Sequence, residues 1–391
     1  MSNDVKIGLV GFGMRARSLT KVAHRPGLGA VVSDVFDIDQ DAARNAGQEL
    51  GFPVTAHATL EALLAADIDA VLIVTPDHLH VEHSIAALRA GLAVYLEKPM
   101  AISAEQCDQI LDEARRSRGR LYLGHNMRHM PFVRAMKEII DSGAIGEPKV
   151  AWCRHFVGHG GDYYFRDWHA DRRFSSGLLF QKGAHDIDIL HWLMGSYSSR
   201  VAAMGQLMVY GDNPRRSVED VETPWRLDDN PLSAWPPAAL RELNPVVDVE
   251  DSSMVIMTLD NGTMASYQQC HFSPDYWRSY TIIGTEGRIE NIGDVEEGTV
   301  INVWNKRHYG YEPADLVVPV HPEPGGHGGA DARIMDEFLG FARSGGPVET
   351  SPIAARYAVA AAEAATQSLR SGGEPRQVPP ARQEDVSYFA D

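Results

Sequence analysis

The feature that most constrains the fold is a glycine-rich turn between a strand-like run and a helical pattern near the start of the chain. Val5–Val10 is strand-like and mostly apolar, and Gly11-Phe12-Gly13-Met14-Arg15-Ala16 follows it directly. In the spacing G-x-G-x-x-A the first glycine permits a tight bend, the second lets a phosphate approach the backbone, and the small last residue packs a helix onto the strand. N–H groups at the helix start hold the anion. We therefore expect Gly11, Phe12, Gly13, Met14 and Arg15 to bind a dinucleotide, against the alternative of a purely structural turn.

Strand-like and helical segments alternate over the first 125 residues, which predicts a parallel sheet covered by helices on both faces. After about Asn126, strand-like runs follow one another directly, and Asp260-Asn261-Gly262 predicts a hairpin with a type I′ turn. The expected fold class is an α/β Rossmann domain (a doubly wound parallel sheet) followed by an α+β domain with a large open, mostly antiparallel sheet. We place the domains at 1–125 and 126–391, for cofactor and for substrate and oligomerisation.

Asp37 ends the second strand-like run, close to the spacing of roughly 20 residues expected for a ribose-binding carboxylate. A carboxylate there accepts hydrogen bonds from ribose hydroxyls and repels a 2′-phosphate. Ile38 follows, where an arginine would favour NADP. The sequence therefore favours NAD over NADP. Two alternatives stay open: Asp37 only caps the turn, or Asp39 takes the ribose role.

Polar motifs follow the next two strands, at the sheet edge where ligands bind in such folds. They are Thr75-Pro76 with His80, and Glu97-Lys98-Pro99. With Gly124-His125-Asn126-Met127-Arg128, Gly143–Pro148 and Gly183-Ala184-His185 with Asp188, these motifs make the chain resemble the Gfo/Idh/MocA family (glucose–fructose oxidoreductase, inositol dehydrogenase and rhizopine catabolism) over nearly its whole length.

The resemblance implies an NAD-dependent dehydrogenase that moves a hydride at a ring hydroxyl of a sugar, sugar derivative or cyclitol. It implies that Lys98 contacts both the nicotinamide ribose and the substrate. In this family the peptide bond before the corresponding proline, here Pro99, is often cis. The resemblance also implies a homodimer or homotetramer. Burial and a positive nicotinamide lower a lysine pKa, so Lys98 could accept the alcohol proton. The further cofactor contacts implied are Thr75, Pro76, His80, Glu97 and Asn126, and Arg128 is an implied substrate contact.

The chain departs from the family where an aspartate usually precedes the late histidine by four residues, because Gln181 stands there. Gln181, His185 and Asp188 are spaced to share one helix face. Gln181 holds a hydroxyl but takes no proton, so we expect proton transfer to depend on Lys98 and His185, with Gln181 beside them. The alternative is a core histidine satisfied by Asp188. Lys182 either points away or binds an anionic group.

An aromatic segment, 163–169, precedes this helix. Aromatic rings stack on sugar C–H faces, so Tyr163 and Trp168 are expected in a substrate wall, with core packing as the alternative. His155 and His159 lack a convincingly spaced third ligand, so no metal is expected. His271, and His327 or Arg333 near the glycine-rich run 325–329, are weaker substrate candidates.

Composition limits the partners. The formal net charge of -17 repels nucleic acid and anionic lipid. The short polar N-terminus has no signal-peptide pattern, no apolar run reaches the roughly 18–20 residues that span a bilayer, and three cysteines make a poor disulfide framework, so we expect a cytoplasmic protein. The stretch 211–249 is expected to be a site lid or a subunit contact, and the segment from Pro375 onward a surface extension.

Two other functions remain open. A redox-assisted glycoside hydrolase would oxidise a hydroxyl, eliminate the aglycone, hydrate and reduce the product back, using NAD catalytically and taking deuterium from solvent. A non-catalytic NAD sensor would bind the cofactor and turn over no carbohydrate.

Overall fold

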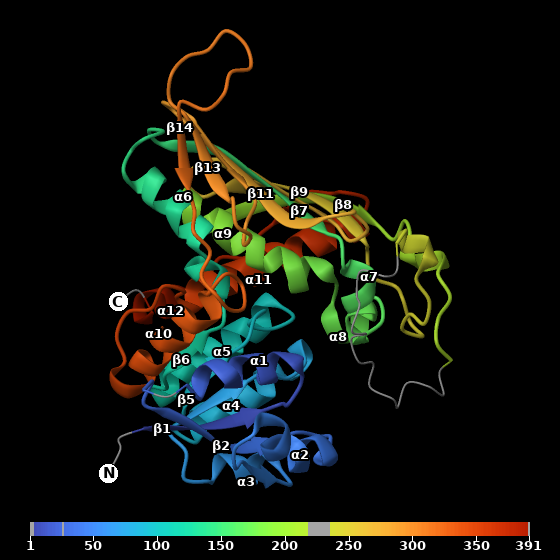
Figure 1. The fold of residues 1–391 in the computed structure, drawn as a ribbon, viewed down its shortest axis with the longest axis vertical. Coiled ribbons are helices and arrows are strands. Elements are labelled where there is room, and N and C mark those ends of the chain that lie inside the picture. Colours follow the sequence, from blue (N-terminus) through green and yellow to red (C-terminus); the bar gives the residue numbers. More distant parts are fainter. Residues whose placement is uncertain (1–3, 26, 218–234, 390–391) are drawn as a thin grey trace. The chain divides into compact units, whose positions relative to one another are not determined.

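The computed structural model describes residues 4–25, 27–217 and 235–389 (Figure 1). It consists of two compact units. The first combines Met1–Pro131 with Glu323–Arg356 and Ala381–Asp391, and the second combines Phe132–Pro322 with Tyr357–Pro380. In the part of the chain that is described, no helix combines the length and apolarity needed to cross a membrane.

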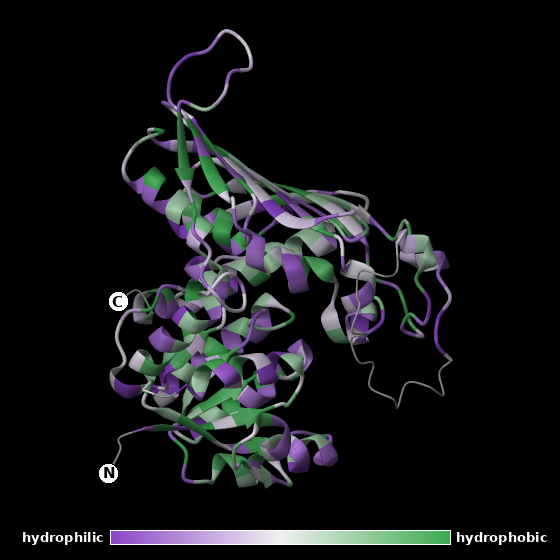
Figure 2. Ribbon diagram, in the orientation of Figure 1, coloured by the Kyte–Doolittle hydropathy of each residue, from purple (hydrophilic) through white to green (hydrophobic). Residues whose placement is uncertain are grey.

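The first unit contains the predicted parallel sheet. Its six strands pair in the order 3-2-1-4-5-6 of a doubly wound dinucleotide fold. Strands β4 and β5 are buried at every position, which requires cover on both faces. Figure 2 shows the sheet of this unit as predominantly hydrophobic. The strands are β1 (Val5–Val10), β2 (Ala30–Phe36), β3 (Thr55–His57), β4 (Ala70–Ile73), β5 (Ala93–Leu96) and β6 (Leu121–Leu123).

The helices of this unit follow the predicted alternation, with one addition from far along the chain. Helix α10 packs against α1, β1 and β5, and its Ile334 and Phe338 are fully buried in the core of the sheet. The Ser103 side chain accepts the Gln106 N–H and so caps the N-terminus of α5. The helices are α1 (Met14–Ala23), α2 (Gln40–Leu50), α3 (Leu60–Leu64), α4 (His80–Arg89), α5 (Ala104–Ser117), α10 (Ala330–Ser344) and α12 (Gln383–Tyr388).

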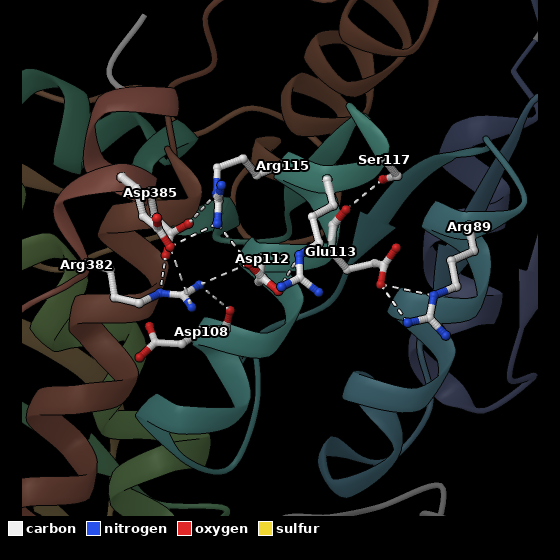
Figure 3. A network of polar contacts seen from close by, with 10 residues as sticks. Arg89, Asp108, Asp112, Glu113, Arg115, Ser117, Arg382 and Asp385 are labelled. Atoms are coloured by element: carbon white, nitrogen blue, oxygen red, sulfur yellow. Dashed lines mark hydrogen bonds and ion pairs between the residues drawn. The ribbon is translucent and has the colours of Figure 1, made fainter.

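The C-terminal segment is not the surface extension expected from its sequence. Asp385 of α12 is fully buried and accepts hydrogen bonds from Arg115 Nε at 3.2 Å and Arg382 Nε at 2.7 Å, while Arg382 also donates to the Asp108 carbonyl at 2.8 Å (Figure 3). Just before it, β15 (Arg376–Gln377) pairs with β8 at the edge of the second sheet. The prediction was wrong because the anchoring partners on α5 are remote in sequence and leave no local signal.

The second unit is built on a nine-stranded sheet in which only β7 and β10 pair in parallel, so the predicted mostly antiparallel sheet is confirmed. Alternate residues of β9 are buried and exposed, as expected when one sheet face is covered and the other open. The strands are β7 (Pro148–Val157), β8 (Ser198–Gln206), β9 (Ser252–Leu259), β10 (Met264–Cys270), β11 (Tyr276–Gly284), β12 (Arg288–Ile292), β13 (Val300–Trp304), β14 (Leu316–Pro319) and β15. The remaining helices are α6 (Pro131–Asp141), α7 (Gly160–Tyr163), α8 (Arg172–Ser175), α9 (Ala184–Met194) and α11 (Pro352–Arg370), with α9 packed on β7 and β10.

The predicted hairpin at Asp260-Asn261-Gly262 forms between β9 and β10, but its turn is not type I′. Leu259 N–H bonds to the Thr263 carbonyl, and of the three turn residues only Gly262 has a positive φ, +80°. A type I′ turn needs positive φ at both central residues. One left-handed glycine in a three-residue turn satisfies the same strands.

The stretch 211–249 is anchored where it is described. Leu240 and Leu243 lie buried in a cluster with Phe165 and Tyr210, and Asn213 Nδ2 donates to the carbonyl oxygens of Pro237 and Leu240. Residues 218–234 of this expected lid or contact segment lie outside the described residues.

Candidate active site

The glycine turn of the first unit has the geometry of a phosphate cradle. Gly11 has φ +94°, and a Cβ there would lie 3.0 Å from the Thr75 methyl group and 3.1 Å from the Val74 carbonyl. Gly13 begins α1 without any side-chain cap, and a Cβ there would meet nothing within 4 Å. An uncapped helix N-terminus with open space before it suits an anion, so these residues fit the pyrophosphate of a dinucleotide.

Asp37 is tied to this turn. Its Oδ2 accepts the Phe12 N–H at 2.6 Å and its Oδ1 accepts the Asp39 N–H at 2.8 Å. Each carboxylate oxygen keeps a second lone pair for a ribose hydroxyl. Asp39 instead caps α2 by accepting the N–H groups of Asp41 and Ala42. The geometry therefore favours Asp37 over Asp39 as the ribose ligand.

His80 connects the ends of β4 and β5. It is buried, with Nδ1 2.8 Å from the Pro99 carbonyl oxygen and Nε2 3.0 Å from the Thr75 carbonyl oxygen. Burial lowers the pKa of His80 to about 4, so its ring is neutral and donates one proton to one of the two carbonyl groups. His80 therefore fixes the Glu97-Lys98-Pro99 turn relative to Thr75.

Lys98 is held by its neighbours on both sides. The Lys98–Pro99 peptide is cis. Buried Glu97 accepts the Lys98 N–H on Oε2 at 2.9 Å and the Arg15 Nε–H on Oε1 at 2.5 Å. Arg15 lies in the first turn of α1, so one guanidinium joins the phosphate-binding helix to the turn that carries Lys98.

The same guanidinium makes a second ion pair. Arg15 Nη1 and Nη2 lie 2.8 and 3.0 Å from the two carboxylate oxygens of Asp331, which also accepts Asn126 Nδ2 at 2.8 Å. Burial opposes charge on Asp331, but hydrogen bonds from His327 and Arg15 hold its pKa well below the usual value. Arg128 is buried and donates to the Glu349 carbonyl at 2.6 Å. Arg333, the other candidate of that region, pairs with Glu323.

In the second unit His185 lies in the first turn of α9. A π-helical turn, η4 (Leu179–Gly183), precedes α9. A π turn holds more residues than an α turn, so the α-helical spacing used to place Gln181 on the face of His185 does not apply. Both side chains are nevertheless buried, 5% and 6% exposed. Such turns are frequent at functional sites.

A buried charge network, missed by the sequence reasoning, is centred on Asp186. Its carboxylate accepts His155 Nδ1 at 2.9 Å, Arg278 Nε at 3.1 Å and the Tyr280 hydroxyl. Burial and the charge of Arg278 lower the pKa of His155 to about 3, so the imidazole is neutral. The described residues offer no cluster of three His, Cys, Asp or Glu side chains for a metal. One sequence signal could have revealed this network. Polar residues stand two positions apart on β7 and on β11, at positions whose side chains face inward.

Lys182 lies near this network, and the sequence did not determine where its side chain points. Its Nζ donates to the Tyr276 hydroxyl at 3.2 Å and lies 5.3 and 5.5 Å from the ring centroids of Tyr164 and Tyr276. Burial opposes a phenolate, but the charges of Lys182 and Arg278 lower the pKa of Tyr276 to about 8. His159 stacks on the Tyr276 ring, with centroids 5.6 Å apart.

The aromatic segment before η4 divides between core and surface. Phe165 is fully buried and stacks on Tyr210 at 4.5 Å, whereas Tyr163 and Trp168 are half-buried, Trp168 stacking on His169 at 3.8 Å. His271 is fully buried and makes an edge contact with the Tyr164 ring, which corrects the expectation that it is a substrate contact. Only the half-buried aromatic side chains remain available to a ligand.

Comparison with known proteins agrees with this geometry. Residues 5–125 match the description "Oxidoreductase family, NAD-binding Rossmann fold" (GFO_IDH_MocA), and residues 137–378 match "Oxidoreductase family, C-terminal alpha/beta domain" (GFO_IDH_MocA_C). The Bacillus subtilis (strain 168) protein YteT is 26% identical over 78% of this chain and 81% of its own length. Inositol 2-dehydrogenase 3 of Saccharopolyspora erythraea is 33% identical over 49% of this chain, and the match spans 54% of that enzyme.

Two solved structures have the same fold. Levoglucosan dehydrogenase in complex with NADH and levoglucosan has a TM-score of 0.77 at 21% identity, covering 96% of this chain and 100% of the other. An oxidoreductase domain protein from Kribbella flavida has a TM-score of 0.79 at 18% identity, with the same coverage. At these identities the likeness concerns the fold alone.

Proposed function

This chain belongs to the Gfo/Idh/MocA family of oxidoreductases and binds NAD through its Rossmann domain, and on that premise we propose that it oxidises or reduces a ring hydroxyl of a sugar, sugar derivative or cyclitol. The relatives named inositol 2-dehydrogenase and levoglucosan dehydrogenase support this substrate class. We assign residues 1–125, together with the later segments of the first unit, to the cofactor, and the second unit within 126–391 to the substrate. The observation that most supports this proposal is the Arg15–Glu97 ion pair, which attaches the turn containing Lys98 to helix α1 behind the glycine turn.

In the proposed reaction, bound NAD supplies the carbon that accepts the hydride. The glycine turn would hold the pyrophosphate and Asp37 the ribose, with Thr75, Pro76, His80, Glu97 and Asn126 shaping the neighbouring surface. Lys98 Nζ would accept the alcohol proton, because a positively charged nicotinamide beside a lysine favours its neutral form. His185 would exchange a proton with the substrate or hold a hydroxyl, while Gln181 holds a hydroxyl without taking its proton.

The test combines a substrate panel with one variant. NADH formation at 340 nm is followed with neutral sugars, sugar acids, cyclitols and glycosides. Lys98→Ala should reduce turnover by roughly 10²–10⁴-fold, the usual contribution of a general base, and leave NAD affinity within about twofold. Lys21→Ala, at an exposed position of α1, is the matched control. Unchanged turnover in Lys98→Ala would exclude the assigned role.

The same assay separates the rival chemistries. A dehydrogenase accumulates NADH in proportion to substrate consumed. A redox-assisted hydrolase releases aglycone without net NADH and incorporates solvent deuterium beside the oxidised carbon. A panel that gives neither product would favour the NAD sensor.

We propose that the open face of the second sheet pairs with another copy of the chain. Met204 and Met254 lie opposite each other on β8 and β9 and are 71% and 60% exposed, and Ile256 and Met264 are exposed beside them. Exposed apolar patches of this kind mark interaction sites. Ile256→Lys should reduce the mass measured by light scattering to that of a monomer, while Tyr309→Lys, on an exposed loop, should not. A wild-type monomer would contradict the proposal.

We also propose a cytoplasmic location. Cys107, Cys153 and Cys270 are all free thiols, and free thiols are typical of a reducing compartment. Fractionation of cells producing the full-length protein tests this assignment.

A further inference from the structure

The charge around Lys182 is unbalanced in a way that the network beside it is not. Arg278 is 5% exposed and faces two buried carboxylates, with Nε 3.1 Å from Asp186 and Nη1 3.7 Å from Asp294. Among the described residues, no carboxylate lies within ion-pair distance of Lys182. Of the two cations, Arg278 therefore pairs with both carboxylates, and Lys182 pairs with neither.

The groups around Lys182 are hydrogen-bond donors and ring faces. Lys182 donates to the Tyr276 hydroxyl, so the hydroxyl proton of Tyr276 is directed elsewhere, and no acceptor for it occurs in the described part of the chain. Tyr164 supplies a second phenol, whose ring centroid lies 5.3 Å from Lys182 Nζ. Lys182 is half-buried and Tyr276 is 37% exposed, so a ligand can reach both.

We propose that Lys182, Tyr276 and Tyr164 form a binding site for a carboxylate group, and that the carbohydrate substrate is an acidic sugar. The proposal names the substrate class of the proposed dehydrogenase and so rests on that function. Lys182 follows Gln181 directly and precedes His185 by one turn, so the carboxylate site and the proposed hydroxyl-binding residues share one helical segment.

A carboxylate fits this site better than a phosphate. One ammonium without a carboxylate partner matches one negative charge, whereas a phosphate monoester carries nearly two and is usually met by an arginine fork or several cations. Arg278, whose guanidinium carbon lies 5.9 Å from the Tyr276 ring centroid, is already engaged by Asp186 and Asp294. Phenol hydroxyls complete a carboxylate site because they donate to an acceptor-only group.

The test measures binding to the NAD-saturated full-length protein by calorimetry at pH 7. The probes are D-glucuronate, D-glucose and D-glucose 6-phosphate. Wild type should prefer glucuronate to both, and Lys182→Met should weaken glucuronate binding roughly 10- to 100-fold, as expected for a charge-assisted hydrogen bond, with glucose changed by less than about twofold. Lys137→Met is the matched control, because Lys137 also lies over an aromatic ring, Trp192, but pairs with Asp141.

A second readout does not depend on the sugar skeleton or on turnover. The difference in tyrosinate absorbance between wild type and Tyr276→Phe reports the titration of Tyr276, whose pKa is lowered to about 8. Acetate or glucuronate bound at Lys182 should raise that pKa, because it offsets the ammonium charge. Tyr276→Phe should itself weaken glucuronate binding about 3- to 10-fold, which keeps the test open if Lys182→Met does not fold.

Three outcomes overturn the proposal. In the first, Lys182→Met, or Tyr276→Phe if that variant does not fold, binds glucuronate as tightly as wild type does. In the second, wild type binds glucose or glucose 6-phosphate as tightly as glucuronate, and in the third glucuronate does not bind and neither carboxylate shifts the Tyr276 titration. The proposed dehydrogenase fails differently, by producing no NADH with any carbohydrate while these binding results are positive.

Discussion

The two units organise buried charge in opposite ways. In the first, Arg15 bridges two carboxylates, Glu97 and Asp331, so the cation near the Lys98 turn is fully paired within the protein. In the second, Arg278 takes both carboxylates and Lys182 is held by phenol groups. Paired charges fix a geometry, while a charge without a counter-ion favours an anionic ligand. The comparison suggests that the first unit is built for a constant cofactor and the second for a particular substrate.

The largest expected effect comes from removing the centre of the second network. Asp186→Asn leaves Arg278 buried with Asp294 alone and takes an ionic acceptor from His155 and Tyr280. Breaking a buried ion pair from one side costs about 3–5 kcal/mol, so the free energy of unfolding should fall by that amount in a denaturant titration. Asp141→Asn, in the exposed i,i+4 pair with Lys137, should cost less than about 0.5 kcal/mol. Similar losses for the two variants would contradict the contrast drawn between buried and exposed pairs.

A smaller effect should follow from breaking the first network. Arg15→Met leaves Glu97 and Asp331 without their cation; because Arg15 is itself 26% exposed, we expect a loss of about 2 kcal/mol at pH 7 and roughly tenfold lower turnover. The folded-state pKa of Asp331 is depressed, so its stabilising contribution exists above the unfolded pKa and disappears as acid protonates the carboxylate. The difference in unfolding free energy between wild type and variant should therefore stay constant from pH 7 to about pH 4 and shrink as the pH falls below that value.

Arg17→Met is the control for that experiment, since Arg17 lies in the same helix and pairs with exposed Glu49. It should leave stability within about 0.5 kcal/mol of wild type at every pH. If Arg15→Met behaves like this control, the bridge between the glycine turn and Lys98 has no energetic role.

The sequence predicted the first unit better than the second because the determinants of the first are local. Gly11 and Asp37 occupy fixed positions relative to consecutive strands, so spacing alone indicates their roles. The partners of Asp186 lie on β7 and β11, and no local pattern indicates which polar side chains meet across a sheet. The π turn before α9 likewise has no recognised sequence signature here, so the direction of Lys182 could not be derived.

The smallest predicted effect concerns the pH dependence contributed by Tyr276. Its folded-state pKa of about 8 lies below the value near 10 of an unfolded tyrosine. Between pH 8 and 10 unfolding therefore takes up a proton, so this group adds stability as the pH rises through that window. Because Tyr276 is 37% exposed, solvent screening limits the gain to about 1 kcal/mol.

Thermal or denaturant unfolding of wild type and Tyr276→Phe at pH 7, 8.5 and 10 measures this gain as a widening difference between the two proteins. Lys182→Met should abolish most of the widening. Burial raises the pKa of Tyr276, and the Lys182 ammonium is the largest of the effects that lower it. Tyr309→Phe, on a fully exposed tyrosine, should show none. A constant difference between wild type and Tyr276→Phe from pH 8 to 10 would mean that the Lys182 ammonium does not stabilise the Tyr276 phenolate. Lys182 would then not act as a positive charge without a carboxylate partner in the second unit.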